Sequence, residues 1–143
     1  SIIDTYFAKY KRVRQYMDEL KEKAKEQGFI ETMYGRKVFL PNINHSNFQV
    51  RSGAERTAIN APIQGTAADI LKLAMIKIKN WLDKEKISDV YMIMQVHDEL
   101  VFEIKECDLK SIGPKICDLM IHADRLNVPL IVNTFNGYNW SEG

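Results

Sequence analysis

Apolar and polar positions follow two different periods along the chain, and each period indicates one type of element. Over residues 2–27 the apolar side chains recur every three or four positions, which is the period of a helix. These positions are Tyr6, Tyr10, Val13, Tyr16, Met17, Leu20 and Ala24. We predict a helix here, in two pieces that break near Tyr10–Lys11, with Gly28 as its C-terminal stop.

Two short apolar runs follow, at residues 29–32 and 37–40, with Tyr34–Gly35 between them. Such runs around a glycine-containing turn predict a β-hairpin, and Pro41 ends its second strand. Residues 42–50 are rich in Asn and indicate a loop before the next element.

Residues 52–84 return to the helical period, but Pro62 and Gly65 lie inside the pattern. A proline removes one backbone donor and crowds the preceding turn, so we expect a kink or break that interrupts the helix there. Thr66, with Asp69 three residues later, is placed to cap the second half. The apolar stripe of that half consists of Ala67, Ile70, Leu71, Ala74, Ile78, Trp81 and Leu82.

The remaining segments predict a second hairpin, a helix and a last strand. Residues 90–96 and 100–104 are nearly all apolar, which is typical of strands that are buried on both faces. Only residues 97–99 separate them, so the connection is a tight turn. A helix is predicted over residues 108–123 and a strand over 129–135. Helices combined with hairpins favour an α+β fold over a doubly wound sheet.

Composition fits one globular domain and excludes several classes of protein. The 143 residues are 45% hydrophobic and 27% charged, which excludes wholesale disorder. Because no run of about 18 apolar residues occurs, we expect no membrane-spanning helix. No secretory leader is visible, and Cys107 and Cys117 are too few for a disulfide framework or a four-cysteine zinc site. A reduced intracellular setting is the simplest interpretation.

Charge is distributed unevenly, although the net charge is only +1. Residues 1–64 carry 11 basic and 7 acidic side chains, whereas residues 65–143 carry 9 basic and 12 acidic ones. The densest basic cluster consists of Lys9, Lys11, Arg12 and Arg14. Such a cluster is typical of a solvated helix face, and it is also compatible with contacts to phosphates.

Two adjacent carboxylates, Asp98 and Glu99, lie at the predicted tip of the second hairpin. Carboxylates that are held rigidly suit a hard cation such as Mg²⁺, which requires near-octahedral oxygen coordination. A pair of such ions can stabilise the attacking and leaving oxygens of a phosphoryl transfer. The other interpretation is that both acids are ordinary polar turn residues.

Three polar side chains, Arg56, Asn60 and Gln64, are spaced four residues apart and therefore share one helix face. Such side chains can donate to the minor-groove acceptors that every base pair presents, so they would contact a duplex without selecting its sequence. The alternative is a solvated polar face that has no partner. The opposite face of the helix carries Ala54, Ala58 and Ala61.

Three segments resemble the C-terminal polymerase region of family A DNA polymerases, the bacterial DNA polymerase I group. Residues 28–41 resemble the family's hairpin between fingers and palm, residues 54–70 resemble its long palm helix, and residues 95–103 resemble its catalytic hairpin. The closing Asn139–Trp140 is also similar. The resemblance spans essentially the whole chain.

The resemblance implies a right-hand polymerase in which helices pack on an antiparallel palm sheet. Residues 1–50 would be the C-terminal part of the fingers with the connecting hairpin, and residues 51–143 the C-terminal part of the palm. The implied reaction is attack of a primer 3′-hydroxyl on a deoxynucleoside triphosphate, in DNA replication or repair. The implied partners are primer–template DNA and deoxynucleoside triphosphates, with two Mg²⁺ (magnesium) ions as cofactors.

The resemblance also implies a role for each matching residue. Asp98 and Glu99 would be catalytic, with Asp98 as a ligand of Mg²⁺ and Glu99 beside it near the primer 3′ end. His97 would contact the primer terminus. The residues implied to contact the minor groove of the primer–template are Arg56, Asn60 and Gln64.

Two signatures of the family are absent from these 143 residues. Nothing matches D-Y-S-x-x-E-L-R, which carries a second catalytic aspartate, and nothing matches the fingers helix R-x₃-K-x₆-Y-G. Tyr34–Gly35 is not that motif, because Gln27 stands where it needs lysine. We therefore expect a C-terminal fragment that is inactive without the rest of the polymerase chain, from a bacterial cytoplasm or an organelle.

Two alternatives stay open on the residues alone. The chain would otherwise be a non-catalytic module that binds duplex DNA, or a relative of the single-subunit RNA polymerases. The resemblance, through Glu99 after Asp98, favours the DNA polymerase.

Overall fold

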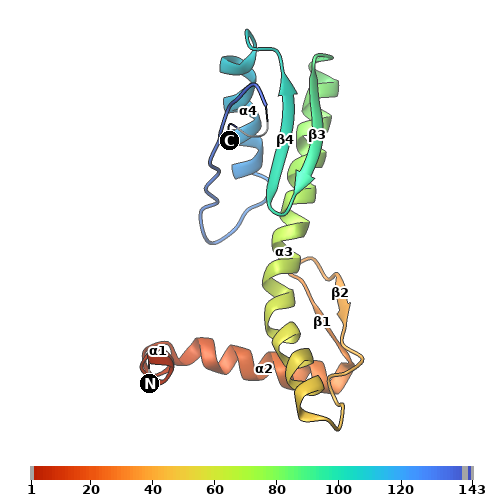
Figure 1. The fold of residues 1–143 in the computed structure, drawn as a ribbon, viewed down its shortest axis with the longest axis vertical. Coiled ribbons are helices and arrows are strands. Elements are labelled where there is room, and N and C mark those ends of the chain that lie inside the picture. Colours follow the sequence, from red (N-terminus) through yellow and green to blue (C-terminus); the bar gives the residue numbers. More distant parts are fainter. Residues whose placement is uncertain (1, 140–141, 143) are drawn as a thin grey trace. The chain divides into compact units, whose positions relative to one another are not determined.

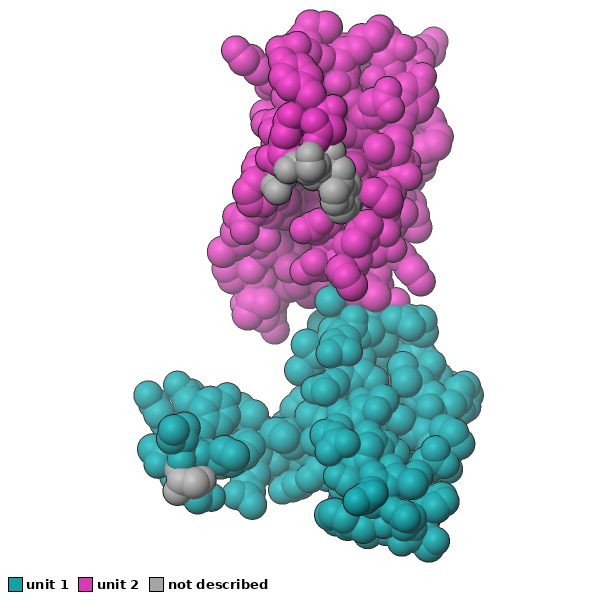
Figure 2. Space-filling model, in the orientation of Figure 1, with its two compact units in different colours: residues 1–67 teal, residues 68–143 magenta. Residues whose placement is uncertain are grey.

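The computed structural model describes residues 2–139 and 142, so Trp140 of the expected closing pair lies outside the described residues. The chain forms two compact units, residues 1–67 and residues 68–143 (Figures 1 and 2). The elements in chain order are α1 (Ile2–Lys9), α2 (Lys11–Gln27), β1 (Phe29–Glu31), β2 (Lys37–Phe39), α3 (Phe48–Lys84), β3 (Val90–Val96), β4 (Glu99–Ile104) and α4 (Leu109–Ile121). The division of fingers from palm at residue 50 stays a prediction.

The N-terminal helices break where the sequence predicts. Tyr10 separates α1 from α2 with a non-helical backbone, at φ −111° and ψ 60°. Gly28 ends α2 in the left-handed conformation at φ 75°, and its N–H donates to the carbonyl of Ala24 at 2.8 Å. Glycine suits this position because it lacks the Cβ atom that makes the conformation costly for other residues.

The predicted first hairpin is formed by β1 and β2, which pair antiparallel with Ile30 opposite Val38. Its turn contains Gly35 at φ 75°, and the turn is bracketed by a hydrogen bond from the N–H of Thr32 to the carbonyl of Arg36. The hairpin shares an apolar core with α2 and α3. The buried members of this core are Leu20, Ala24, Ile30, Leu40, Ile43 and Ala58.

Helix α3 begins at Phe48, inside the segment that was expected to be a loop. Asn47 explains the early start, because its side-chain oxygen accepts hydrogen bonds from the N–H groups of Gln49 and Val50. This is the arrangement of an N-terminal cap, which satisfies donors that have no partner within the helix.

The expected break in α3 is wrong, because one helix runs through Pro62 and Gly65, and the kink stays a prediction. Thr66 does not cap a second helix. Its hydroxyl donates to the carbonyl of Pro62 and accepts the N–H of Met33 from the first hairpin. Contacts with the hairpin support this part of the helix, so tertiary structure outweighs the local effect of the proline.

The second hairpin is formed by β3 and β4, which pair antiparallel from Val90 opposite Ile104 to Val96 opposite Glu99. The register shifts between Met92 and Met94, which leaves Ile93 as an extra residue in β3. Such a β-bulge increases the local twist and changes the face to which the following side chains point.

Helix α4 and the second half of α3 pack on one face of this hairpin (Figure 1). The buried centre of the cluster consists of Ile78, Leu82, Val90 and Ile116. The prediction that both faces are buried is wrong, because Tyr91 and Ile93 are 55% and 57% exposed. An apolar run indicates a strand, but it does not tell how many layers cover the strand.

The predicted last strand is also wrong, since residues 129–135 form no strand. A strand needs a neighbour for its backbone hydrogen bonds, and both sheets of the described residues, β1–β2 and β3–β4, are two-stranded. Among the described residues, no helix combines the length and the apolar character needed to cross a membrane.

Candidate functional site

The polar row on α3 points away from the core of its unit. Arg56, Asn60 and Gln64 are all exposed. Ala58 is completely buried, and Ala54 and Ala61 pack against the same core. The row is thus a solvent-accessible face whose back is fixed by packing. The eight helical steps from Arg56 to Gln64 span about 12 Å, a length comparable to three or four base-pair steps of about 3.4 Å.

The end of the row at Gln64 lies next to the first hairpin. Arg36 donates from its guanidinium to the carbonyl of Gly65 at 2.9 Å, and the N–H of Met33 donates to the hydroxyl of Thr66 at 3.0 Å. Sequence reasoning missed these contacts. The available signal was Gly65 itself, because glycine inside a helix costs about 1 kcal/mol and often marks a close approach.

The three candidate residues of the second hairpin lie together at its tip. His97 and Asp98 form the two-residue turn, and Glu99 begins β4. His97 adopts a positive φ of 51°, which is uncommon for a residue other than glycine. The side-chain amide of Gln95 donates to the carbonyl of His97 at 2.7 Å and so braces the turn. All three candidates are exposed to solvent.

The chemistry of this tip fits part of a metal site. Asp98 and Glu99 offer carboxylate oxygens, the donors that Mg²⁺ prefers. Within residues 2–139 and 142, no group of three or more His, Cys, Asp and Glu side chains is close enough together to hold an ion. The two acids would therefore supply some ligands, and the remaining ligands would come from water, substrate phosphates or other protein segments.

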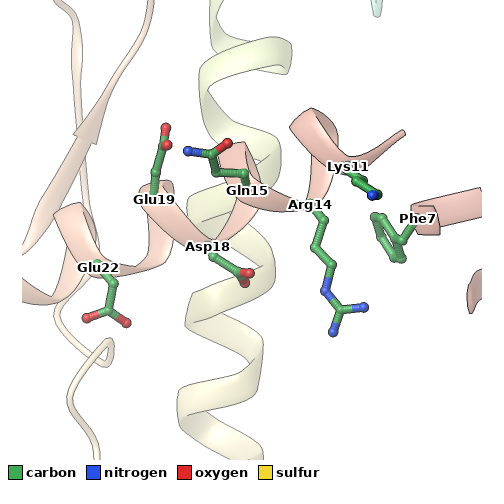
Figure 3. Close-up of a pocket in the computed structure, with 7 residues that line it drawn as sticks. All are labelled: Phe7, Lys11, Arg14, Gln15, Asp18, Glu19 and Glu22. Carbon is green, nitrogen blue, oxygen red and sulfur yellow. The ribbon is translucent and has the colours of Figure 1, made fainter. Parts of the chain in front are cut away.

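One residue of the basic cluster at the N-terminus pairs with an acid on the same helix, and another lies over an aromatic ring. Arg12 lies 3.3 Å from a carboxylate oxygen of Glu19, and the guanidinium of Arg14 lies over the ring of Phe7. An open hollow of about 590 Å³ on α1 and α2 combines basic and acidic residues (Figure 3). Its lining residues are Phe7, Lys11, Arg14, Gln15, Asp18, Glu19 and Glu22. This mixture does not form a uniform phosphate-binding surface.

Comparisons with known proteins place the chain beside one group of enzymes. A model of DNA polymerase family A matches residues 1–142. The chain is 49% identical over 140 residues to DNA polymerase I of Pseudomonas aeruginosa, and 45% identical over 143 residues to DNA polymerase I of Streptococcus pneumoniae. Each alignment covers 98% of this chain but only 15% and 16% of those relatives. The chain therefore spans a small part of their length.

A solved structure is similar as well. It is the POL domain of Pol1 from M. smegmatis in complex with a DNA primer–template and dNTP. The similarity has a TM-score of 0.83 at 39% sequence identity, and it covers 90% of this chain and 23% of that chain. The predicted α+β fold is confirmed.

Proposed function

Because this chain belongs to DNA polymerase family A, we propose that it is part of a template-directed DNA polymerase that acts in DNA replication or repair. The enzyme would add deoxynucleotides to a primer 3′-hydroxyl. The observation that carries this proposal is the placement of Asp98 and Glu99 at the exposed tip of a hydrogen-bonded hairpin. A ladder of paired strands holds these acids at a fixed position while leaving them open to substrate.

In this proposal Asp98 and Glu99 are the catalytic residues of the chain, and Asp98 is the metal ligand. Two Mg²⁺ ions, when bound, would neutralise the charge that develops on the oxygens during phosphoryl transfer. Asp98 would hold one side of that site, and Glu99 would lie beside it near the primer 3′ end. His97, the first residue of the turn, would contact the primer terminus.

Helix α3 would bind the duplex product of the reaction. Arg56, Asn60 and Gln64 are donors on one exposed face, and they can reach acceptors such as adenine N3 and thymine O2 in the minor groove. Contacts to these acceptors test duplex geometry at nearly every base pair. The similar M. smegmatis domain is in complex with a DNA primer–template and dNTP, which supports the same partners here.

The complete enzyme would need residues beyond these 143. We assign residues 1–50 to the fingers with the connecting hairpin and residues 51–143 to the palm. The strand with a second catalytic aspartate and the fingers helix that binds the nucleotide would come from the rest of the polymerase chain. The chain alone is then inactive. The bacterial relatives favour the bacterial cytoplasm as the location.

The test is Asp98→Asn in the complete polymerase that contains these residues. We expect templated extension to fall by about 100-fold or more, the usual cost of removing one group that stabilises transition-state charge. The dissociation constant for primer–template should change little. Asp83→Asn is the matched control, because Asp83 is an exposed acid that pairs with Lys79 on α3.

Each alternative function has its own outcome in this experiment. Undiminished extension by Asp98→Asn would contradict the catalytic role of the hairpin. A complete protein that binds duplex but never extends a primer would be the non-catalytic binding module. Preferential incorporation of ribonucleotides would identify a relative of the single-subunit RNA polymerases.

A further inference from the structure

The first hairpin is joined to α3 at one place, which we call the hairpin–helix contact. It consists of Thr32, Met33 and Arg36 on the hairpin side and Gly65 and Thr66 on the helix side. Two hydrogen bonds cross it, from the N–H of Met33 to the Thr66 hydroxyl and from the Arg36 guanidinium to the Gly65 carbonyl. Figure 1 shows the β1–β2 hairpin beside this part of α3.

Packing at the hairpin–helix contact is as specific as its hydrogen bonds. A Cβ atom at Gly65 would lie 2.6 Å from the methyl carbon of Thr32, which is closer than two carbon atoms that are not bonded to each other can approach. Thr32 and Thr66 are only 5% and 6% exposed. The Thr66 hydroxyl uses both its donor and its acceptor function, because it also donates to the carbonyl of Pro62. Removing a buried hydroxyl that makes two hydrogen bonds leaves its partners unsatisfied, which is costly.

The part of α3 at this contact follows the residues through which the apolar core of its unit meets the helix. The apolar core reaches the helix through Ala54, Ala58 and Ala61, which all precede it in the chain. Pro62 has no N–H, so the helical hydrogen bond to the carbonyl of Ala58 is missing. The hairpin–helix contact begins three residues later, at Gly65, and is thus placed to hold the turn that follows this missing hydrogen bond.

Gln64 is the last residue of the polar row on α3, and it immediately precedes Gly65 in this turn. We propose that the hairpin–helix contact positions Gln64 for the minor groove, with Thr32, Arg36 and Thr66 as positioning residues that do not themselves touch the base edges. This inference rests on the proposed function, in which Gln64 contacts the duplex. Arg56 lies two turns earlier, on the part of α3 that the core supports.

The test compares two substitutions of Thr66 in the complete polymerase. Thr66→Val keeps the shape of the side chain but removes the hydroxyl, whereas Thr66→Ser keeps the hydroxyl. Binding of a fluorescently labelled primer–template is measured by anisotropy. We expect Thr66→Val to raise the dissociation constant about tenfold, in the range for loss of one contact to a base edge. Thr66→Ser should stay close to wild type.

A double-mutant cycle separates positioning from a merely structural role. If Thr66 acts through Gln64, then Thr66→Val should add nothing once Gln64→Ala has removed the contact. Hydrogen exchange gives an independent readout, because Thr66→Val should raise the exchange of residues 32–36 and leave α2 unchanged. Additive effects on binding, or a wild-type affinity for Thr66→Val, would overturn the inference.

A second pair of variants keeps the test valid if Thr66→Val folds poorly. Gly65→Ala should weaken binding because its methyl group meets that of Thr32, and adding Thr32→Ser should restore binding by removing that methyl group. Failure of this restoration would also overturn the inference. The proposed function fails differently: Gln64→Ala would then bind primer–template as tightly as wild type, and no duplex contact would exist to be positioned.

Discussion

The side-chain amide of Gln95 donates a hydrogen bond to the backbone carbonyl of His97 at 2.7 Å. This bond braces the turn that carries Asp98, so its loss should let the carboxylate move. A neutral hydrogen bond contributes about 0.5–1.5 kcal/mol, so we expect Gln95→Ala to slow extension by the complete polymerase about threefold to tenfold. Gln49→Ala, at an exposed glutamine of α3, is the control. Equal extension rates would show that the turn holds its shape without Gln95.

Gln64 should recognise the minor groove through one acceptor. Gln64→Ala is expected to weaken binding of primer–template by about 1–3 kcal/mol. With a duplex that carries 3-deazaadenine, which lacks the N3 acceptor, at the contacted position, wild type and variant should bind equally. The measurement is a set of dissociation constants for both proteins on both duplexes. A penalty of the same size on the modified duplex would argue against this contact.

The 143-residue chain alone should not extend a primer. It lacks the motif for a second catalytic aspartate and the motif for the nucleotide-binding helix. The assay supplies Mg²⁺, primer–template and all four deoxynucleoside triphosphates, and it follows primer length by gel electrophoresis. Templated extension by the purified chain would contradict the proposal that the site is completed by other segments.

Ile78 is the best single probe of the core formed by α3, α4 and the second hairpin, because its side chain is completely buried. We expect Ile78→Ala to lower the free energy of unfolding by about 2–5 kcal/mol, through lost burial and the cavity left behind. Ile76 lies on the same helix but is 57% exposed, so Ile76→Ala should cost far less. Urea unfolding of the two variants gives the comparison. Similar costs would mean that this core is not packed as described.

Lys25 connects α2 to α3 through charge. Its Nζ atom lies 3.0 Å from Glu22 and 3.6 Å from Glu55, and the hydrogen bond to Glu22 is the main reason that the pKa of Lys25 is raised above 10.5. The stabilisation by the Lys25 ion pairs is fully present below pH 10.5, where Lys25 is protonated in the unfolded chain as well. It is lost as the pH rises through the pKa of Lys25 in the folded chain.

Unfolding of wild type and Lys25→Met at increasing pH measures this contribution. The difference in free energy of unfolding should be about 1 kcal/mol or less, because the pair is partly solvated, and it should vanish above the folded pKa. If the difference in free energy of unfolding does not depend on pH, then packing of the Lys25 methylene groups, and not the ion pairs, stabilises the folded chain.

Local signals in the sequence predicted most elements of the fold. Tyr10 separates two helices, Gly28 ends the second one, and both hairpins occur where their turns were expected. These features depend on residues close together in the chain. The family resemblance was also predictable, and the comparisons confirm it, because its motifs are contiguous.

Features that depend on distant residues were not predicted. The continuity of α3 through Pro62 is accompanied by a hydrogen bond between Met33 and Thr66, which are 33 positions apart. The expected strand at residues 129–135 has no partner strand in the described part of the chain. The roles of Asp98 and Gln64 stay predictions for a different reason, because they concern atoms of DNA and metal that lie outside the protein.

The extra residue Ile93 determines which face of the second hairpin each later residue of β3 occupies. Side chains of a strand alternate between two faces, so one unpaired position exchanges the faces of every residue between it and the turn. Gln95 therefore stands opposite Leu100, a residue of the packed face. Substitutions along β3 preserve this pairing, and deletion of Ile93 would remove the bulge while Met94, Gln95 and Val96 keep their partners in β4. The bulge thus allows a strand of seven residues to pair with a strand of six without displacing the turn that holds Asp98.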